Sequence, residues 1–261
     1  MHSLVRGVFL LTACVFVAAC ANATPPSRMG QYLKSDQQAS APESLLKTEQ
    51  RPLKAGLVLV LDQPDQTAAA VLPEEALVRL GDTLKQDIAR VLPVTVTEVL
   101  SAEGVRPQDQ GGDLTRLFDL AKNKGLDYLA VVVVSSTEQE YPVTLFLGWT
   151  SHAQPGYRRD NWSLLEFALI EVKSGKAVMQ AEGRGWATLD RPTAPGINQW
   201  YPVVYLRPQE PERRIWPPTY EGAPNTLRVV SFEQAEKRLT LKLQNSWLGQ
   251  LEADAAARRS S

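Results

Sequence analysis

Hydrophobic runs and helical stripes alternate along the first part of the chain. Residues 55–61 form an unbroken apolar run of strand length, which is typical of a strand covered on both faces. Pro73 and the two glutamates after it suit the first turn of a helix. Pro93 ends that helical pattern, and the alternating residues 94–100 predict a second strand. The buried stripe of the helix is Leu77, Leu80, Leu84, Ile88 and Val91.

A second helix and a strongly apolar strand follow. Asp113 comes after two glycines and can cap a helix whose apolar residues fall between 114 and 121. Gly125 suits the left-handed conformation that ends such a helix. Residues 128–134 are a run of tyrosine, leucine, alanine and valines, which predicts a strand in the centre of the sheet.

The pattern then changes to antiparallel strands. Residues 142–149 and 162–172 have strand patterns, and the polar residues 150–161 predict a loop between them. Segment 162–172 is apolar on both faces, which is typical of a strand covered on both sides. A tight turn within 171–178 predicts a hairpin whose return strand runs to about residue 188.

A helix closes the pattern. Ser231 and Gln234 have the spacing of a capping box, and apolar residues at helical spacing continue from there toward residue 258. The element order is β-α-β-α-β-β-β-α. It predicts an α/β (α+β) fold with one mixed β-sheet and helices packed on it, in a single domain over residues 55–258.

Three segments carry a resemblance to known envelope proteins. They are the strand 57–61, the run Ala-Lys-Asn-Lys-Gly-Leu-Asp-Tyr-Leu at 121–129 and the hairpin Glu-Val-Lys-Ser-Gly-Lys-Ala-Val at 171–178. With the element order, they resemble the α/β domain of the curli-secretion lipoprotein CsgG, the amino-terminal domain of TolB and the rhombotarget lipoproteins. The resemblance covers residues 57–190 and the last helix. It implies a shared architecture, which by itself does not specify function.

The resemblance to a secretion lipoprotein raises an alternative, an oligomeric subunit of an export or secretion assembly. A membrane-crossing hairpin needs strands of about 9 to 11 residues that alternate apolar with polar side chains. Segment 143–149 is too short for this, and segment 162–172 is apolar on both faces. We therefore expect no hairpin that inserts into a membrane by itself.

The first twenty residues differ from the rest of the chain. Residues 1–6 carry one positive charge, and residues 7–19 form an apolar stretch of the length usual in export signals. The stretch ends in Val17-Ala18-Ala19-Cys20, which resembles the lipobox of bacterial lipoproteins. In that family the cysteine is lipidated and the signal is cut just before it. This resemblance implies a signal peptide over residues 1–19 and a lipidation site at Cys20.

Two alternatives to this reading exist. Residues 11–14 also fit the lipobox pattern, with a shorter apolar region before Cys14. An ordinary secretory signal cut near Ala21 or Ala23 would discard both cysteines. Because both cysteines lie in this segment, the mature body can form no internal disulfide even in a compartment that permits one.

Lipidation implies a bacterial cell envelope protein held in a membrane by acyl chains such as palmitate. Ala21 stands where enteric lipoproteins of the inner membrane carry aspartate, so we expect the periplasmic face of the outer membrane. Residues 20–54 are rich in serine, glutamine, proline and alanine. They predict a flexible lipidated tether that holds the domain clear of the bilayer.

Charge and catalytic residue types narrow the function classes. Loss of Arg6 with the signal leaves 27 of the 28 basic residues against 29 acidic ones, so no basic excess suggests nucleic acid as a partner. His2 also leaves with the signal, and His152 alone cannot assemble a zinc site. No Gly-x-Ser-x-Gly elbow presents a serine, which makes a hydrolase using His152 the least favoured alternative. We expect no enzyme, no cofactor and no metal.

The most unusual stretch is residues 191–224. Its eight prolines predict irregular structure, although residues 203–206 could form a short edge strand. Aromatic and arginine side chains alternate with the prolines, a composition typical of interface hot spots. They either bind a partner or fold back over an open face or edge of the sheet, and Tyr157, Arg158 and Arg159 could extend the same surface. The candidate partner-binding residues are Trp200, Tyr201, Tyr205, Arg207, Arg213, Arg214, Trp216 and Tyr220.

These features together predict a membrane-anchored envelope lipoprotein. Its domain would act as a non-enzymatic interaction or assembly module that binds another envelope protein. Oligomerisation is compatible with every one of these features.

Overall fold

The computed structural model describes residues 25–33, 37, 53–62, 72–103, 105–107, 114–146, 153–192, 203–206, 214–215 and 223–260. The strands are β1 (Leu53–Leu61), β2 (Val94–Leu100), β3 (Tyr128–Phe146), β4 (Ala153–Glu171), β5 (Ala177–Pro192), β6 (Val203–Leu206) and β7 (Arg214–Ile215). The helices are α2 (Met29–Tyr32), α3 (Glu74–Val91), α4 (Thr115–Asn123) and α5 (Ala223–Ser260).

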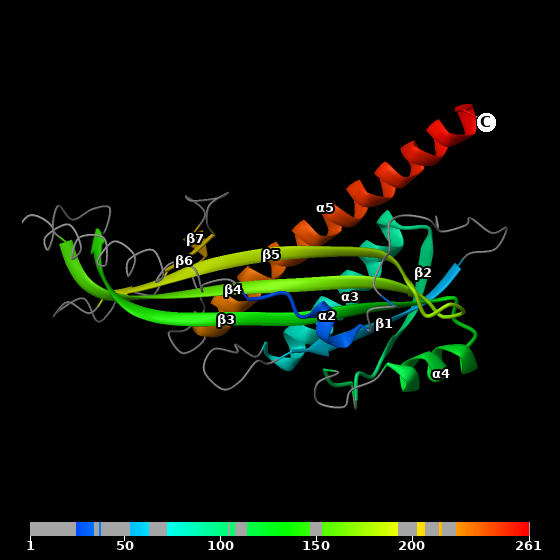
Figure 1. The fold of residues 1–261 in the computed structure, drawn as a ribbon. Coiled ribbons are helices and arrows are strands. Elements are labelled where there is room, and N and C mark those ends of the chain that lie inside the picture. The colour runs from blue at the N-terminus through cyan, green and yellow to red at the C-terminus, as the bar shows by residue number, and fades with distance from the viewer. Residues whose placement is uncertain are drawn as a thin grey trace, which may run out of the picture.

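The strands form one mixed sheet in the order β2-β1-β3-β4-β5-β6-β7. β1 pairs in parallel with β2 and β3, and every later neighbour pairs antiparallel. Figure 1 shows the long strands of the antiparallel half running the length of the molecule, with the helices gathered over one part of them. The predicted α/β fold with a single mixed sheet is confirmed.

The parallel half follows the hydrophobic pattern closely. α3 begins directly after Pro73 and buries Leu80, Leu84 and Ile88, as its helical spacing predicts. α4 is followed by Gly125, whose φ of 65° is the left-handed conformation that lets the chain turn back into β3. β1 has a strand on each side and a helical layer on each face, which explains its unbroken apolar run.

The antiparallel half departs from the predicted element boundaries. β3 and β4 each contain 19 residues and pair along their whole length, from Tyr128 opposite Glu171 to Phe146 opposite Ala153. The predicted loop over 150–161 is therefore wrong from residue 153 onward. Polar residues dominate this part of the hairpin, and among the described helices only the start of α5 reaches its inner end, where Ser231 bonds to Asn161. The segment therefore carries little hydrophobic signal of a strand.

Two helical layers enclose the sheet at its other end. α3 and α5 pack on one face with Leu165, Phe167 and Leu169 of β4. α4 and α2 pack on the opposite face with Ala168 and Ile170 of the same strand. The prediction that this strand is covered on both sides is confirmed.

The last helix is longer than the sequence pattern predicts. α5 contains 38 residues and begins at Ala223, so the predicted capping box at Ser231 and Gln234 is wrong. Ser231 lies inside the helix with its side chain fully buried against the sheet. Its hydroxyl donates to the carbonyl oxygen of Asn161 on β4 at 3.2 Å. Figure 1 shows the C-terminal part of α5 continuing past the edge of the sheet.

Two glycines allow α5 to lie directly on β5. A Cβ atom at Gly183 would lie 2.0 Å from the carbonyl oxygen of Ala235, and one at Gly185 would lie 2.1 Å from that of Ser231. Only a residue without a side chain permits this approach. Arg238 of α5 also reaches over β5 and donates from Nη1 to the carbonyl oxygen of Arg184.

Part of the predicted tether is packed on the sheet. Residues 25–33, which we call the strap, contain α2, and three strap side chains are buried in the core below it. Met29, Tyr32 and Leu33 are 7%, 4% and 1% exposed. The expectation of a flexible segment over 20–54 is therefore wrong for the strap. The composition of residues 25–33 did not indicate that they dock on the sheet, because the docking depends on a carboxylate far away in the sequence, which is described below.

Candidate partner-binding arm

The long strands continue past the first turn of α5 as an extension of the sheet (Figure 1). We call residues 137–146, 153–162 and 186–192 the arm. β6 and β7 widen the arm at one side, where β6 pairs with Ala187–Asp190 of β5. The segments predicted to bind a partner leave from these strands, so the arm is the scaffold on which they are held.

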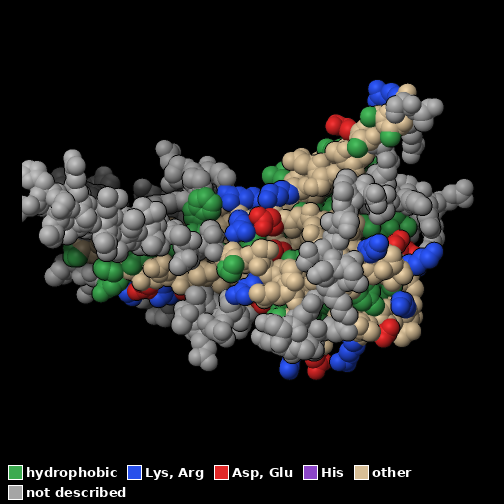
Figure 2. Space-filling view, viewed as in Figure 1, with side chains coloured by type: hydrophobic (Ala, Val, Ile, Leu, Met, Phe, Trp, Pro, Cys, Tyr) green, Lys and Arg blue, Asp and Glu red, His purple; other side chains and the backbone are tan. Residues whose placement is uncertain are grey.

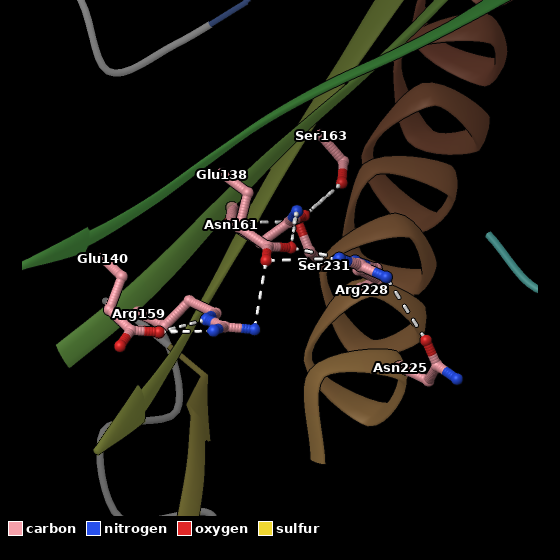
Figure 3. Close-up of polar contacts among 8 residues, drawn as sticks. All are labelled: Glu138, Glu140, Arg159, Asn161, Ser163, Asn225, Arg228 and Ser231. Atoms are coloured by element: carbon pink, nitrogen blue, oxygen red, sulfur yellow. Dashed lines mark hydrogen bonds and ion pairs between the residues drawn. The ribbon is translucent and has the colours of Figure 1, made fainter. Parts of the chain in front are cut away.

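One face of the arm carries a ladder of ion pairs (Figure 3). Glu140 accepts from Arg159 Nε at 2.7 Å and from Arg191 Nη2 at 3.0 Å. Glu138 accepts from Arg228 Nε at 2.9 Å and lies 3.5 Å from Arg159 Nη1. Two carboxylates thus meet three guanidinium groups, which leaves this face with a local excess of positive charge.

The ladder continues into a buried polar network that joins the arm to α5 (Figure 3). Asn161 Nδ2 donates to Glu138 at 3.3 Å, and its Oδ1 accepts from the Ser163 hydroxyl at 3.0 Å. The hydroxyls of Ser163 and Ser231 lie 2.7 Å apart. Because Asn161, Ser163 and Ser231 are each at most 1% exposed, these bonds are shielded from water and fix the helix on the strands.

The opposite face of the arm is also polar. Asp160 accepts from the hydroxyls of Tyr141 and Thr188, each at 2.6 Å. Arg158 makes a two-pronged pair with Asp190, at 2.7 and 2.9 Å. Burial and the bond to Asp160 raise the pKa of Tyr141 to about 12, so its hydroxyl stays protonated and donates at any physiological pH.

An exposed aromatic side chain sits on the ladder face. Tyr157 is 41% exposed, and the Arg191 guanidinium lies 5.2 Å from the centre of its ring. The two residues are paired across β4 and β5. Tyrosine with arginine is the composition found at interface hot spots, so this position is suited to contact a partner.

The structure brings two of the predicted binding residues into the sheet. Tyr205 in β6 pairs with Thr188 of β5 on one side and with Arg214 of β7 on the other. The strand predicted at 203–206 is present, although β7 and not β6 forms the edge. The remaining candidates, which lie outside the described residues together with Cys20 and His152, are Trp200, Tyr201, Arg207, Arg213, Trp216 and Tyr220.

Strand length is no argument against a membrane-crossing hairpin, because β3 and β4 pair through 19 residues each. Charge is the argument instead. One face of the arm holds Arg158 and Asp160, and the other holds Glu140 and Arg159. Charged side chains in contact with lipid tails are costly, so these four residues suit this part of the arm to polar partners.

The strap is held by one buried carboxylate. Glu166 of β4 is 4% exposed and points from the sheet toward the start of α2. The backbone N–H of Arg28 donates to it at 2.7 Å, the N–H of Met29 at 3.2 Å, and the Ser27 hydroxyl also donates. These donors replace the water that the carboxylate loses on burial.

Further polar contacts fix both ends of the strap. The Tyr32 hydroxyl donates to Asp62 at 2.6 Å, and Arg28 Nε lies 3.4 Å from the same carboxylate. At the other end, Arg184 Nη1 donates to the carbonyl oxygen of Pro25 at 3.1 Å. The strap is therefore an integral part of the fold from its first described residue.

Sequence reasoning missed both the ladder and Glu166. The ladder leaves a faint signal, since Glu138 and Glu140 are two apart on one strand and Arg159 follows on the next. Within the described ranges, no three His, Cys, Asp or Glu side chains are placed to hold a metal ion. In the same ranges, no helix combines the length and the apolar character needed to cross a bilayer.

Fold and site together define an α/β domain whose single mixed sheet extends at one end as a charged arm. No family model and no curated protein matches the chain. Among solved structures, one from Helicobacter pylori, described as a homolog of a neuraminyllactose-binding hemagglutinin, is 12% identical and covers 88% of this chain and 97% of its own, with a TM-score of 0.39.

Two further structures show weaker likeness. The PelC dodecamer from Paraburkholderia phytofirmans is 12% identical over 70% of this chain and 88% of its own, with a TM-score of 0.27. Protein XCC0632 from Xanthomonas campestris is 11% identical over 78% and 88%, with a TM-score of 0.29. At such scores neither the fold nor the site draws support from these relatives, and both rest on the chain's own structure.

Proposed function

We propose that this chain is a lipid-anchored, non-enzymatic interaction module at the periplasmic face of a bacterial outer membrane. The observation that carries the proposal is the short distance in sequence between Cys20 and the docked strap. Only four residues lie between Cys20 and Pro25, and the five steps from one to the other reach about 17 Å when fully extended. A lipid on Cys20 would therefore hold the domain at the membrane surface and in a restricted orientation.

The arm is the surface that we propose for partner binding. It offers Tyr157 and Arg191 on one face, an excess of guanidinium groups around Glu138 and Glu140, and the strands that lead into residues 191–224. Arginine and tyrosine on a rigid scaffold suit a polypeptide partner with acidic and apolar groups. Such a partner would be another envelope protein.

Replacing Cys20 with serine tests the anchor. Without a thiol no thioether-linked lipid can form, so palmitate labelling should disappear and the protein should leave the membrane fraction. The measurement is metabolic labelling with fractionation of cells. Cys14→Ser is the matched control and should change neither result, and a Cys20→Ser protein that still carries label and sediments with membranes would contradict the anchor.

A specific feature also favours the alternative of an oligomeric assembly subunit. Leu241, Leu248 and Leu251 lie on the outer side of α5 and are 58%, 48% and 43% exposed. Figure 2 shows hydrophobic side chains on the length of α5 that stands free of the body. Their spacing of seven and three residues matches a helix-pairing seam, which a second copy of the chain could cover.

Site-specific photo-crosslinking in cells separates the two functions. A crosslinker at position 157 on the arm should trap a protein other than this chain, whereas one at position 248 should trap a second copy if the chain assembles through α5. Trapped bands are identified by mass spectrometry. A crosslinker at Lys122, on the exposed side of α4, is the control position and should trap neither. Absence of any adduct at position 157 would remove the arm as a binding surface.

A further inference from the structure

A cleft opens between α3 and α5 on the side of the sheet opposite the strap. Its volume is about 240 Å³. Leu72, Leu80 and Phe232 contribute apolar walls and are themselves 6%, 6% and 4% exposed. An apolar cavity of about 150 Å³ is sufficient to bind benzene, so this cleft can hold a group of six to eight carbon atoms.

One wall of the cleft carries a buried acid. Glu236 of α5 lines the cleft and is 8% exposed. Its Oε1 atom is fully buried and has no hydrogen-bond partner among the described residues. Burial, together with the nearby carboxylates of Asp87 and Glu233, raises the pKa of Glu236 to about 7. A buried carboxyl oxygen without a donor is destabilising, and a donor that entered the cleft would relieve that cost.

The described charged groups around Glu236 leave its Oε1 atom without a hydrogen-bond partner. On α3, Asp87 accepts from the Thr240 hydroxyl at 2.9 Å and pairs with Arg90 at 2.7 Å. Arg79 is 64% exposed and lies 3.6 Å from Glu233 at the rim. Lys237 follows Glu236 on α5 but is exposed to water. Arg79, Glu233 and Lys237 thus line the cleft from its exposed rim, whereas Glu236 is the buried charged residue of its described lining.

We infer that the α3–α5 cleft binds a small amphipathic amine, with its apolar group against Leu72, Leu80 and Phe232 and its ammonium group on Glu236. An ammonium supplies the donor that Oε1 lacks and the positive charge that favours the ionised carboxylate. An alcohol of the same size would make the same contacts with the apolar walls but would bring no positive charge to Glu236. The site is distinct from the arm and the strap, and it does not depend on a lipid at Cys20.

Hexylammonium chloride is the probe, and 1-hexanol is the matched neutral control, which also accounts for partition into detergent. Hexylammonium is titrated into the isotope-labelled full chain in detergent, and chemical shifts of α3 and α5 are followed by NMR. Binding should be about tenfold tighter at pH 8 than at pH 6, because Glu236 is mostly ionised above pH 7 and mostly protonated below it, while the amine keeps its charge throughout. Hexanol should bind equally at both pH values.

Three variants make the inference falsifiable. Glu236→Gln keeps the shape of the side chain and should weaken hexylammonium at pH 8 by about tenfold or more. Ala76→Phe fills the cleft and should abolish binding with the acid in place, whereas Glu233→Gln at the exposed rim should change affinity less than about threefold. Equal affinity in wild type and Glu236→Gln, or no response of the wild-type cleft to the amine, would overturn the assignment.

Discussion

Replacing Gly183 with alanine should destabilise the protein by about 3 kcal/mol or more, the upper end of the cost of overpacking a core. The new Cβ would lie 2.0 Å from the Ala235 carbonyl oxygen and 2.5 Å from the Leu239 nitrogen. Both are backbone atoms of α5, so no side chain can rotate away, and the helix must lift off β5. Displacing the helix also removes Phe232 of α5 from the hydrophobic core that it shares with the sheet. Urea unfolding followed by circular dichroism measures the loss.

Gly249→Ala is the matched control in the same helix. A Cβ at Gly249 meets nothing within 4 Å, so an added methyl group has open space there. Alanine there should stabilise the helix by up to about 1 kcal/mol, because glycine is a poor helix former. If Gly183→Ala proved as stable as wild type, direct contact between helix and strand at this position would be excluded.

Replacing Glu166 with glutamine should release the strap from the sheet. A neutral amide accepts hydrogen bonds more weakly than a carboxylate, and its NH₂ group would oppose the donors that Ser27, Arg28 and Met29 present. Loss of a charge-assisted interaction of about 2 kcal/mol corresponds to a roughly 30-fold rise in the opening equilibrium. Hydrogen exchange of the amides of residues 28–33 should accelerate by that factor.

Glu98→Gln serves as the control for this experiment. Glu98 is an acid of β2 that pairs with Lys124 at 2.6 Å, away from the strap. Its neutralisation should leave exchange of the strap amides unchanged. If the strap amides exchanged at the wild-type rate in Glu166→Gln, the packing of Met29, Tyr32 and Leu33 would be sufficient to hold the strap, and the carboxylate would have no part in it.

The sequence was sufficient to predict the elements that bury continuous apolar surface. β1, α3 and the first part of β3 all follow from runs and stripes of hydrophobic residues, because burial is what those patterns record. The left-handed conformation of Gly125 was also predicted, since the turn that ends a helix in this conformation favours glycine. These features depend on local sequence and on the contrast between inside and outside.

The arm and the strap could not be predicted in the same way. Arm residues such as Glu140 and Arg159 form ion pairs with each other across neighbouring strands. Strands held by such pairs are polar, so their hydrophobicity pattern is the same as that of a loop. The capping motif at Ser231 was misleading because the same hydroxyl can bond to a strand as readily as to its own helix. Glycines 183 and 185 lie within the predicted return strand, and nothing in that pattern indicated their close contact with α5.

The bond between Arg28 and Glu166 joins residues that are 138 positions apart in the chain. A chain that emerges amino-terminus first must therefore present most of its sheet before the strap has anything to bind. Contacts of such long separation form late, after the local hairpins and helices. Docking of the strap is therefore the step of folding that we expect last, and residues 25–33 stay accessible until β4 is in place.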